Sequence, residues 1–121
     1  MGYRSDVVAL IYPAGGEDNL LKYDQLKLLM NTAFKSFLDS WDEHFVWDDT
    51  HRVLKFSAED VKWYESYPDV KDFGEYLTKM HELEYEYEII RVGEEDTDIE
   101  YDSTGDAQGY LRVRREIEVD F

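Results

Sequence analysis

The chain contains no cysteine and only two prolines in 121 residues. The absence of cysteine excludes a disulfide framework, a thiolate nucleophile and a sulfur metal site, and it agrees with a reducing compartment. No apolar run approaches the roughly 20 residues that cross a bilayer as a helix. The opening letters, MGYRSD, lack the basic and apolar regions of a signal peptide. We therefore expect no membrane association and no secretion.

Basic residues are also scarce, since 13 Lys and Arg stand against 29 Asp and Glu, for a formal net charge of −16. This balance opposes direct binding to nucleic acid or to anionic lipid, and it favours a basic partner. Apolar residues make up 43% of the chain and aromatic residues 16%. That content is sufficient for a buried core, so we expect residues 1–121 to form a single domain.

Hydrophobic periodicity predicts most of the elements. The unbroken apolar run from Val7 to Tyr12 indicates a strand that is covered on both faces and is central in its sheet. The stretch from Tyr23 to Trp41 predicts one long amphipathic helix, and residues 70–80 predict a second. Short β-like runs at 44–47 and 52–56 predict a hairpin between the two helices.

From Leu83 the period changes to two, which is typical of a strand. Tyr85, Tyr87 and Ile89 point to one side, and Glu84, Glu86 and Glu88 point to the other. Two later runs alternate as well, so three strands in series predict an antiparallel meander.

The order is β-α-β-β-α-β-β-β, which predicts an α+β fold. We expect a two-layer sandwich in which an antiparallel or mixed sheet carries both helices on one face. Its core would be a split βαβ-like unit, extended by the C-terminal β-meander. The opposite face of the sheet would carry the acidic side chains.

Two short motifs stand out, the opening MGYRSDV and the run DVKWYESYPDV from Asp60 to Val70. Both resemble a group of small proteins that bacteriophages and prophages encode. Members of the group open with Met-Gly-Tyr-Arg-Ser and have a similar Val-Lys-Trp-Tyr stretch. The resemblance covers these motifs and the order of elements between them, whereas the acidic C-terminal part lies outside it. It implies a phage origin and the cytoplasm of the host cell, but it supplies no catalytic or binding residues.

Catalytic and metal motifs are weak. His44 and His51 flank the predicted hairpin with two aspartates between them, so a metal site can be drawn, but a solvated hairpin tip is the favoured interpretation. The acidic run 94–106 has Tyr101 and Ala107 where a calcium-binding EF-hand loop needs glycine and glutamate. A weak, irregular cation site stays open there. We expect no enzyme activity, no metal and no cofactor.

The distribution of acid is the strongest functional signal. Residues 82–121 hold fourteen acidic and four basic residues. Carboxylates on alternate strand positions are about 6.7 Å apart, so neighbouring strands could present a dense negative surface, which we call the acidic plate. The predicted partner-binding residues are Glu84, Glu86, Glu88, Glu94, Glu95, Asp96, Asp98, Glu100 and Asp102.

An acidic plate resembles the phosphate backbone of a nucleic acid. The first hypothesis is therefore a non-catalytic phage protein that binds and inhibits a basic, nucleic-acid-binding protein of the host, as an anti-restriction or anti-CRISPR protein would. The alternative is a phage accessory interaction module whose acidity only maintains solubility. That module would use an aromatic surface, with Trp41, Trp47, Trp63, Tyr64, Tyr67 and Tyr76 as its candidates. The identity of the partner and the oligomeric state remain open.

Overall fold

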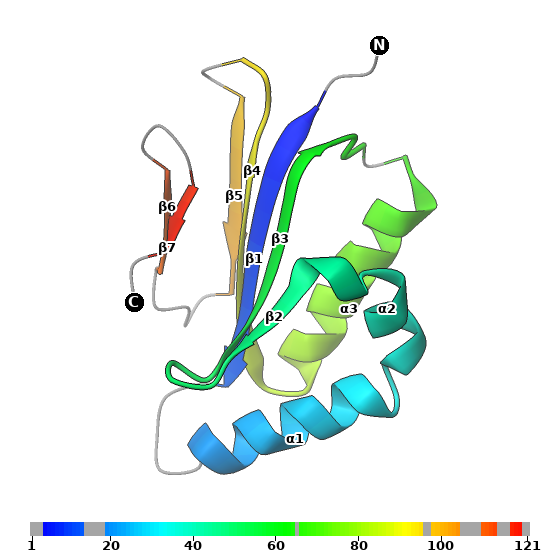
Figure 1. The fold of residues 1–121 in the computed structure, drawn as a ribbon, viewed down its shortest axis with the longest axis vertical. Helices are drawn as coiled ribbons and strands as arrows, with labels where there is room; N and C mark the ends of the chain where they lie inside the picture. Colours follow the sequence, from blue (N-terminus) through cyan, green and yellow to red (C-terminus); the bar gives the residue numbers. More distant parts are fainter. Residues whose placement is uncertain are drawn as a thin grey trace.

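The computed structural model describes residues 4–13, 19–64, 66–95, 98–104, 110–113 and 117–119. Within these ranges the chain forms a five-stranded antiparallel sheet in the order β2-β3-β1-β4-β5, with the helices on one face (Figure 1). The predicted α+β class, with a helical layer on a sheet, is confirmed.

Strand β1 (Ser5–Pro13) lies at the centre of the sheet. It pairs antiparallel with β3 (Val53–Val61) on one side and with β4 (Tyr85–Val92) on the other. Several of its side chains are fully buried, and they belong to both faces: Val7, Ala9, Leu10 and Ile11. The prediction of a central, doubly covered strand from its apolar run is confirmed.

The remaining strands complete two sheets. β2 (Phe45–Asp48) forms the predicted hairpin with β3, and β5 (Ile99–Ser103) pairs with β4. β6 (Leu111–Val113) and β7 (Ile117–Val119) form a separate two-stranded sheet. The predicted meander is therefore present in β4 and β5, but the last run folds back on itself as a hairpin and does not join the main sheet.

The predicted long helix is broken into α1 (Asn19–Asn31) and α2 (Lys35–Ser40). The side chains at the break compete with helical hydrogen bonding, because Thr32 Oγ1 donates to the carbonyl of Leu28 at 2.7 Å. Asn31 Nδ2 likewise donates to the carbonyl of Lys27 at 2.8 Å. The chain turns here, and a short 3-10 helix, η1 (Asp42–His44), follows α2.

Helix α3 (Pro68–Glu82) agrees with the predicted second helix. Pro68 stands at its first position, where a missing N–H costs no hydrogen bond. Its buried side chains are Phe73, Tyr76, Leu77 and Met80. No helix in the described part of the chain is long and apolar enough to cross a membrane.

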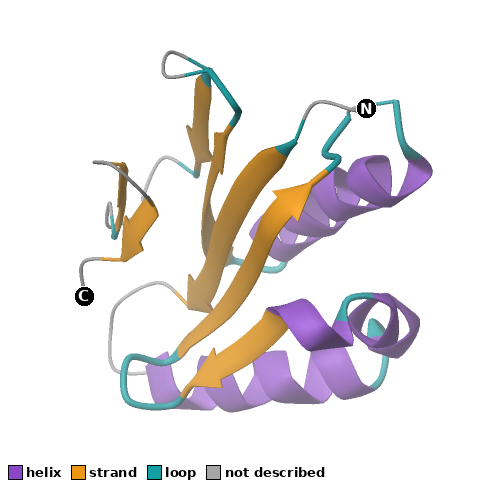
Figure 2. Cartoon of the chain, turned by 45° about the horizontal axis from the view of Figure 1, so that its top comes forward, coloured by secondary structure: helices purple, strands orange, loops and turns teal. Residues whose placement is uncertain are grey.

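Figure 2 shows the helices and the sheet as two layers. Aromatic side chains fill the space between them. Phe37 of α2 stacks on Tyr76 of α3 with ring centroids 4.3 Å apart. Phe73 lies 4.5 Å from Phe56 of β3, and Trp41 lies 5.4 Å from the same ring. Such aromatic pairs add to the free energy gained by burial, so this cluster fixes α2 and α3 on the sheet.

The second face of the sheet is covered in part by the β6 and β7 hairpin, on the left in Figure 1. The buried residues of this smaller core are Leu10, Tyr12, Val53, Ile90 and Leu111. Ile117 and Val119 of β7 pack against it. The expectation that this face presents acid to solvent is wrong, because much of it is a second apolar core.

Asp49, in the turn between β2 and β3, ties that turn to α1 and allows a pH test. Lys27 Nζ and the Tyr23 hydroxyl both donate to its Oδ1 at 2.7 Å. The Lys27 and then the Tyr23 hydrogen bonds lower the pKa of Asp49 below its ordinary value of 3.8. Asp49 therefore contributes its full stabilisation at a pH above the pKa that it has in the unfolded chain. This stabilisation is lost as the pH falls through the lower pKa of the folded protein.

We expect Asp49→Asn to destabilise the protein at pH 7, and we expect the difference from wild type to shrink as the pH falls below about 4. Urea unfolding of both proteins from pH 7 to pH 2.5 measures this difference. In a Lys27→Met background the pH-dependent part should be smaller, because the main cause of the lowered pKa is removed. A difference that stays constant with pH would contradict the role of Asp49.

Candidate functional site

Two of the predicted partner-binding residues are buried. In β4 the alternation is as predicted, with Tyr85, Tyr87 and Ile89 on the helical side. On the other side, however, Glu86 is 6% exposed and Glu88 is 0% exposed. The prediction that these carboxylates lie on an open surface is wrong, because the C-terminal segment covers them.

Glu88 accepts four hydrogen bonds. Oε2 accepts from the Tyr12 hydroxyl at 2.7 Å and from the backbone N–H of Tyr110 at 3.2 Å. Oε1 accepts from the Tyr101 hydroxyl and the backbone N–H of Leu111, both at 3.3 Å. Since Tyr110 and Leu111 lead into β6, this carboxyl group holds the β6 and β7 hairpin on the sheet. Glu86 makes a similar link, because it accepts from the hydroxyl of Thr104.

Replacing Glu88 by glutamine should release the hairpin. The glutamine side-chain N–H₂ would face two of the four donors, and each buried donor left unpaired costs about 1–3 kcal/mol. We expect faster hydrogen exchange at the amides of Tyr110 and Leu111, while the amides of β1 stay protected. Glu84→Gln is the matched control, since the side chain of Glu84 is 81% exposed. Unchanged exchange at Tyr110 and Leu111 would show that Glu88 does not anchor the hairpin.

Three other predicted residues are scattered. Glu84 lies in the turn before β4 with a positive φ of 70° and pairs with Lys22 Nζ at 3.1 Å. Glu94 accepts from the backbone N–H of Arg4 at 3.0 Å, and Glu95 is exposed beside it. Asp96 lies outside the described residues. These carboxylates do not extend a plate formed by β4.

The last three predicted residues lie in β5 or directly before it, and two of them contact Arg91. Asp98 and Glu100 both bond its guanidinium, at 2.6 and 2.7 Å from Nη2, and these two hydrogen bonds raise the pKa of Arg91 above its ordinary value. Asp102 accepts from the backbone N–H of Ser103 at 2.9 Å and forms no ion pair with any described residue. One guanidinium neutralises only one of these three negative charges, so the three acids together with Arg91 carry a net charge of −2.

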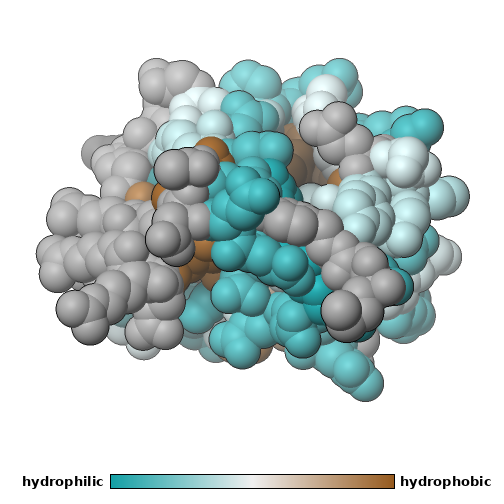
Figure 3. Space-filling model, turned by 90° about the horizontal axis from the view of Figure 1, so that it is seen from above, coloured by the Kyte–Doolittle hydropathy of each residue, from teal (hydrophilic) through white to brown (hydrophobic). Residues whose placement is uncertain are grey.

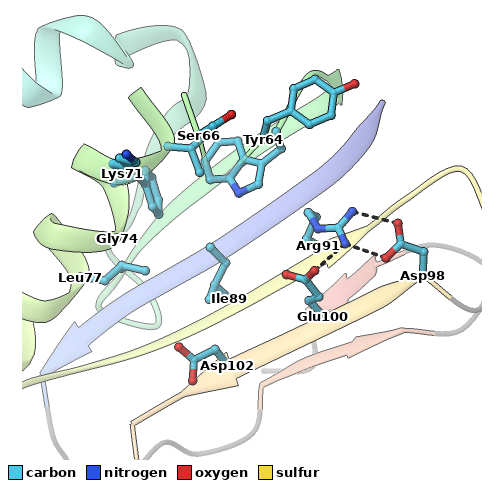
Figure 4. Close-up of a pocket in the computed structure, with 13 residues that line it drawn as sticks. Tyr64, Ser66, Lys71, Gly74, Leu77, Ile89, Arg91, Asp98, Glu100 and Asp102 are labelled. Atoms are coloured by element: carbon cyan, nitrogen blue, oxygen red, sulfur yellow. Dashed lines mark hydrogen bonds and ion pairs between the residues drawn. The ribbon is translucent and has the colours of Figure 1, made fainter. Parts of the chain in front are cut away.

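These residues line one side of a groove of about 720 Å³ between α3 and β5, hereafter the α3–β5 groove. Figure 4 shows Ile89 at its floor, the Arg91 ion pairs on the side of β5, and Lys71, Gly74 and Leu77 on α3 opposite. Its apolar lining is completed by Trp63, Val70 and Phe73. The groove thus joins an apolar floor to an acidic rim on the side of β5, with Lys71 on the side of α3.

Gly74 is the reason that the groove is open along α3. Val70, Phe73, Gly74 and Leu77 occupy i, i+3, i+4 and i+7, which is the apolar stripe of the helix. A side chain at Gly74 would project into the groove, and its Cβ would meet no atom within 4 Å. The missing side chain leaves space where a larger residue would close the wall.

The open space around Gly74 predicts a gain in stability on adding a methyl group. Gly74→Ala should raise the free energy of unfolding by about 0.5–1 kcal/mol, because alanine restricts the unfolded chain and favours helix. Urea denaturation at pH 7 measures the change. A lower free energy of unfolding would mean that the added methyl group meets an obstacle in the wall.

The histidines of the hairpin do not converge. His51 Nδ1 lies 2.9 Å from Asp48 Oδ2, whereas His44 Nδ1 lies 3.0 Å from the carbonyl of Ser57. Across the described ranges, no group of three or more His, Cys, Asp or Glu residues is placed to hold a metal ion.

The aromatic candidates from the sequence divide between core and surface. Tyr76 is buried, and Trp41 and Trp47 pack against the helix-side core. Trp63 and Tyr64 line the α3–β5 groove. Tyr67 is 41% exposed and lies 5.1 Å from the Tyr64 ring, just outside it.

Comparison of the chain with protein-family models, with curated proteins and with solved structures gives no match in any of the three.

Sequence reasoning did not identify the groove, nor Arg91, Lys71 and Gly74 as parts of one site. Arg91 and Glu100 face each other in the β4 and β5 register, which depends on the length of the connecting turn. The one usable signal was Gly74, since a glycine within an apolar helical stripe often marks a close approach or an open space.

Proposed function

We propose that this protein is a non-catalytic binding protein of phage type whose partner is a basic protein, and that the α3–β5 groove receives that partner. The observation that supports the proposal most directly is the combination of an apolar floor and an acidic rim in one groove of about 720 Å³. Interface centres are typically apolar and aromatic with a charged margin, and this groove has that composition.

The charge of the whole chain favours the same class of partner. At −16, the protein attracts a basic protein and repels nucleic acid and other acidic proteins. Figure 3 shows the molecule from above the view of Figure 1. Hydrophilic residues form most of the coloured surface there, and hydrophobic residues are visible only in recesses. A partner would be drawn by charge and held by the recessed apolar residues.

Binding, and not catalysis, also fits the side chains of the rim. Arg91 is engaged by Ser5, Asp98 and Glu100 at the same time, with its own side chain only 12% exposed. A guanidinium held in this way keeps the rim in place and is not available to a reacting group. Proteins that handle nucleic acid are the basic partners that the proposal favours, because their lysine and arginine side chains match Glu100 and Asp102.

This proposal is not phosphate mimicry, because mimicry would require an extended acidic plate. Glu86 and Glu88 are inside the protein, so among the described residues of β4 and β5 the exposed carboxylates are those of β5. Aromatic and acidic residues act together at the groove, which unites parts of both hypotheses drawn from the sequence.

Capture from a bacterial lysate, with the captured proteins identified by mass spectrometry, tests the proposal when groove variants are compared. Gly74→Leu should fill the groove, and Asp102→Lys should reverse its uncompensated charge. We expect both to lose the same set of basic proteins. Capture by the wild type should fall as NaCl rises from about 0.05 to 0.5 M, because screening shortens the range of charge interactions.

The matched controls are Thr78→Leu, on the same helix outside the lining of the groove, and Asp24→Lys, an exposed charge reversal on α1. They should retain the captured set. Loss of the same proteins in the controls, or their retention by both groove variants, would overturn the groove as the site. A captured set without basic proteins would overturn the class of partner.

A further inference from the structure

Strand β5 forms one edge of the main sheet. It follows β4 in the strand order, and within the described ranges β4 is the only strand that pairs with it. Four of its five residues, 99–102, are exposed. An edge strand presents backbone groups that another extended chain can bond.

The hydrogen bonds to β4 identify those groups. Gly93 N donates to the carbonyl of Asp98 at 2.8 Å, and Thr104 N donates to the carbonyl of Tyr87 at 3.1 Å. In an antiparallel pair the bonded positions alternate, so residues 98, 100, 102 and 104 direct their N–H and C=O toward β4. The backbone groups of Ile99, Tyr101 and Ser103 therefore point outward from the sheet.

The side chains of β5 differ between its two faces. Glu100 and Asp102 stand opposite Arg91 and Ile89 in the register, on the face of the α3–β5 groove. Ile99 and Tyr101 stand on the other face and are 44% and 50% exposed. An added strand would thus meet acid on one face and apolar surface on the other.

A second copy of this chain is a poor occupant of the edge. When two β5 strands pair antiparallel through Ile99, Tyr101 and Ser103, every register that bonds at least two of these positions places Glu100 or Asp102 of one copy opposite Glu100 or Asp102 of the other. Like charges directly opposed across strands are destabilising. Acid on the edge therefore opposes self-association and selects a strand of opposite charge.

We infer that the partner enters by strand addition. An extended segment with basic and apolar residues in alternation pairs with β5 as a sixth strand. Its basic side chains lie opposite Glu100 and Asp102, and its apolar side chains lie beside Ile99 and Tyr101. The inference rests on the proposed function, since it names how a basic partner engages the rim of the groove. Backbone hydrogen bonds supply affinity in this mode, and the alternate side chains supply specificity.

A capped peptide of alternating valine and lysine, VKVKVKV, tests the inference by fluorescence anisotropy. Its valines fall opposite Ile99, Tyr101 and Ser103, so their N–H groups bond β5, whereas the lysine N–H groups point away. A peptide N-methylated at the valines should lose measurable binding. The same peptide N-methylated at the lysines is the matched control and should bind like the parent. Asp102→Lys should weaken binding of the parent about fivefold, and Asp24→Lys should not.

Hydrogen exchange locates the added strand, because the outward amides of Ile99 and Tyr101 should gain protection when VKVKVKV binds, whereas the amide of Ser103 already donates to Asp102 Oδ1. Equal binding by both methylated peptides, or no gain in protection, would overturn strand addition and leave the proposed function standing. Failure of VKVKVKV to bind while the wild type captures basic proteins would do the same. If the charge-reversed peptide VEVEVEV bound equally well, the preference for a basic partner would be overturned, and the proposed function with it.

Discussion

The structure depends on β1 being buried on both faces and paired on both edges. Val7 and Ile11 lie under the helices, and Leu10 lies under the C-terminal hairpin, all without exposure to solvent. Such a strand is stable only when each face is covered, so the helical layer and the hairpin are both required by the same few residues. The cover on the second face also explains why acidic residues of β4 are inside the protein. Glu88 lies where the cover begins, and its four hydrogen bonds join the sheet to the hairpin.

The elements were predictable from sequence to the extent that local pattern decides them. The apolar run of β1, the stripe of α3 and the alternation in β4 all produced the expected structures. The alternation of side chains along a strand, however, specifies only which face of the sheet each residue lies on. Whether that face is covered depends on residues far along the chain. Tyr110 and Leu111, more than twenty residues after Glu88, both donate to its carboxylate from the segment that covers it. The break between α1 and α2 was missed for a related reason, because the apolar period continues through Thr32 while its hydroxyl bonds the backbone.

The groove follows from the width of the sheet relative to its helical layer. The aromatic cluster fixes α3 over the middle strands, and the groove that remains between α3 and β5 is lined on the α3 side by Val70, Gly74 and Leu77. A longer side chain at Gly74 would extend the helical cover toward β5 and bury Ile89 completely. Without it, β5 extends past α3 with an apolar face, formed by Ile99 and Tyr101, and a charged face, formed by Glu100 and Asp102. The groove therefore depends both on the missing side chain at Gly74 of α3 and on the exposed side chains of β5.

The pairing of charges along β5 then decides which part of the acid is available. Glu100 stands opposite Arg91 in the register and shares the single positive charge of that guanidinium with Asp98. Asp102 stands opposite Ile89 and has no basic residue across from it. Opposed unlike charges stabilise a strand pair by some tenths of a kcal/mol, so Glu100 strengthens the sheet in a way that Asp102 does not. Asp102 forms no ion pair within the described part of the fold and lies at an open edge beside an apolar groove. In the proposed mode of binding it would therefore repel a second copy of this chain and attract a basic segment.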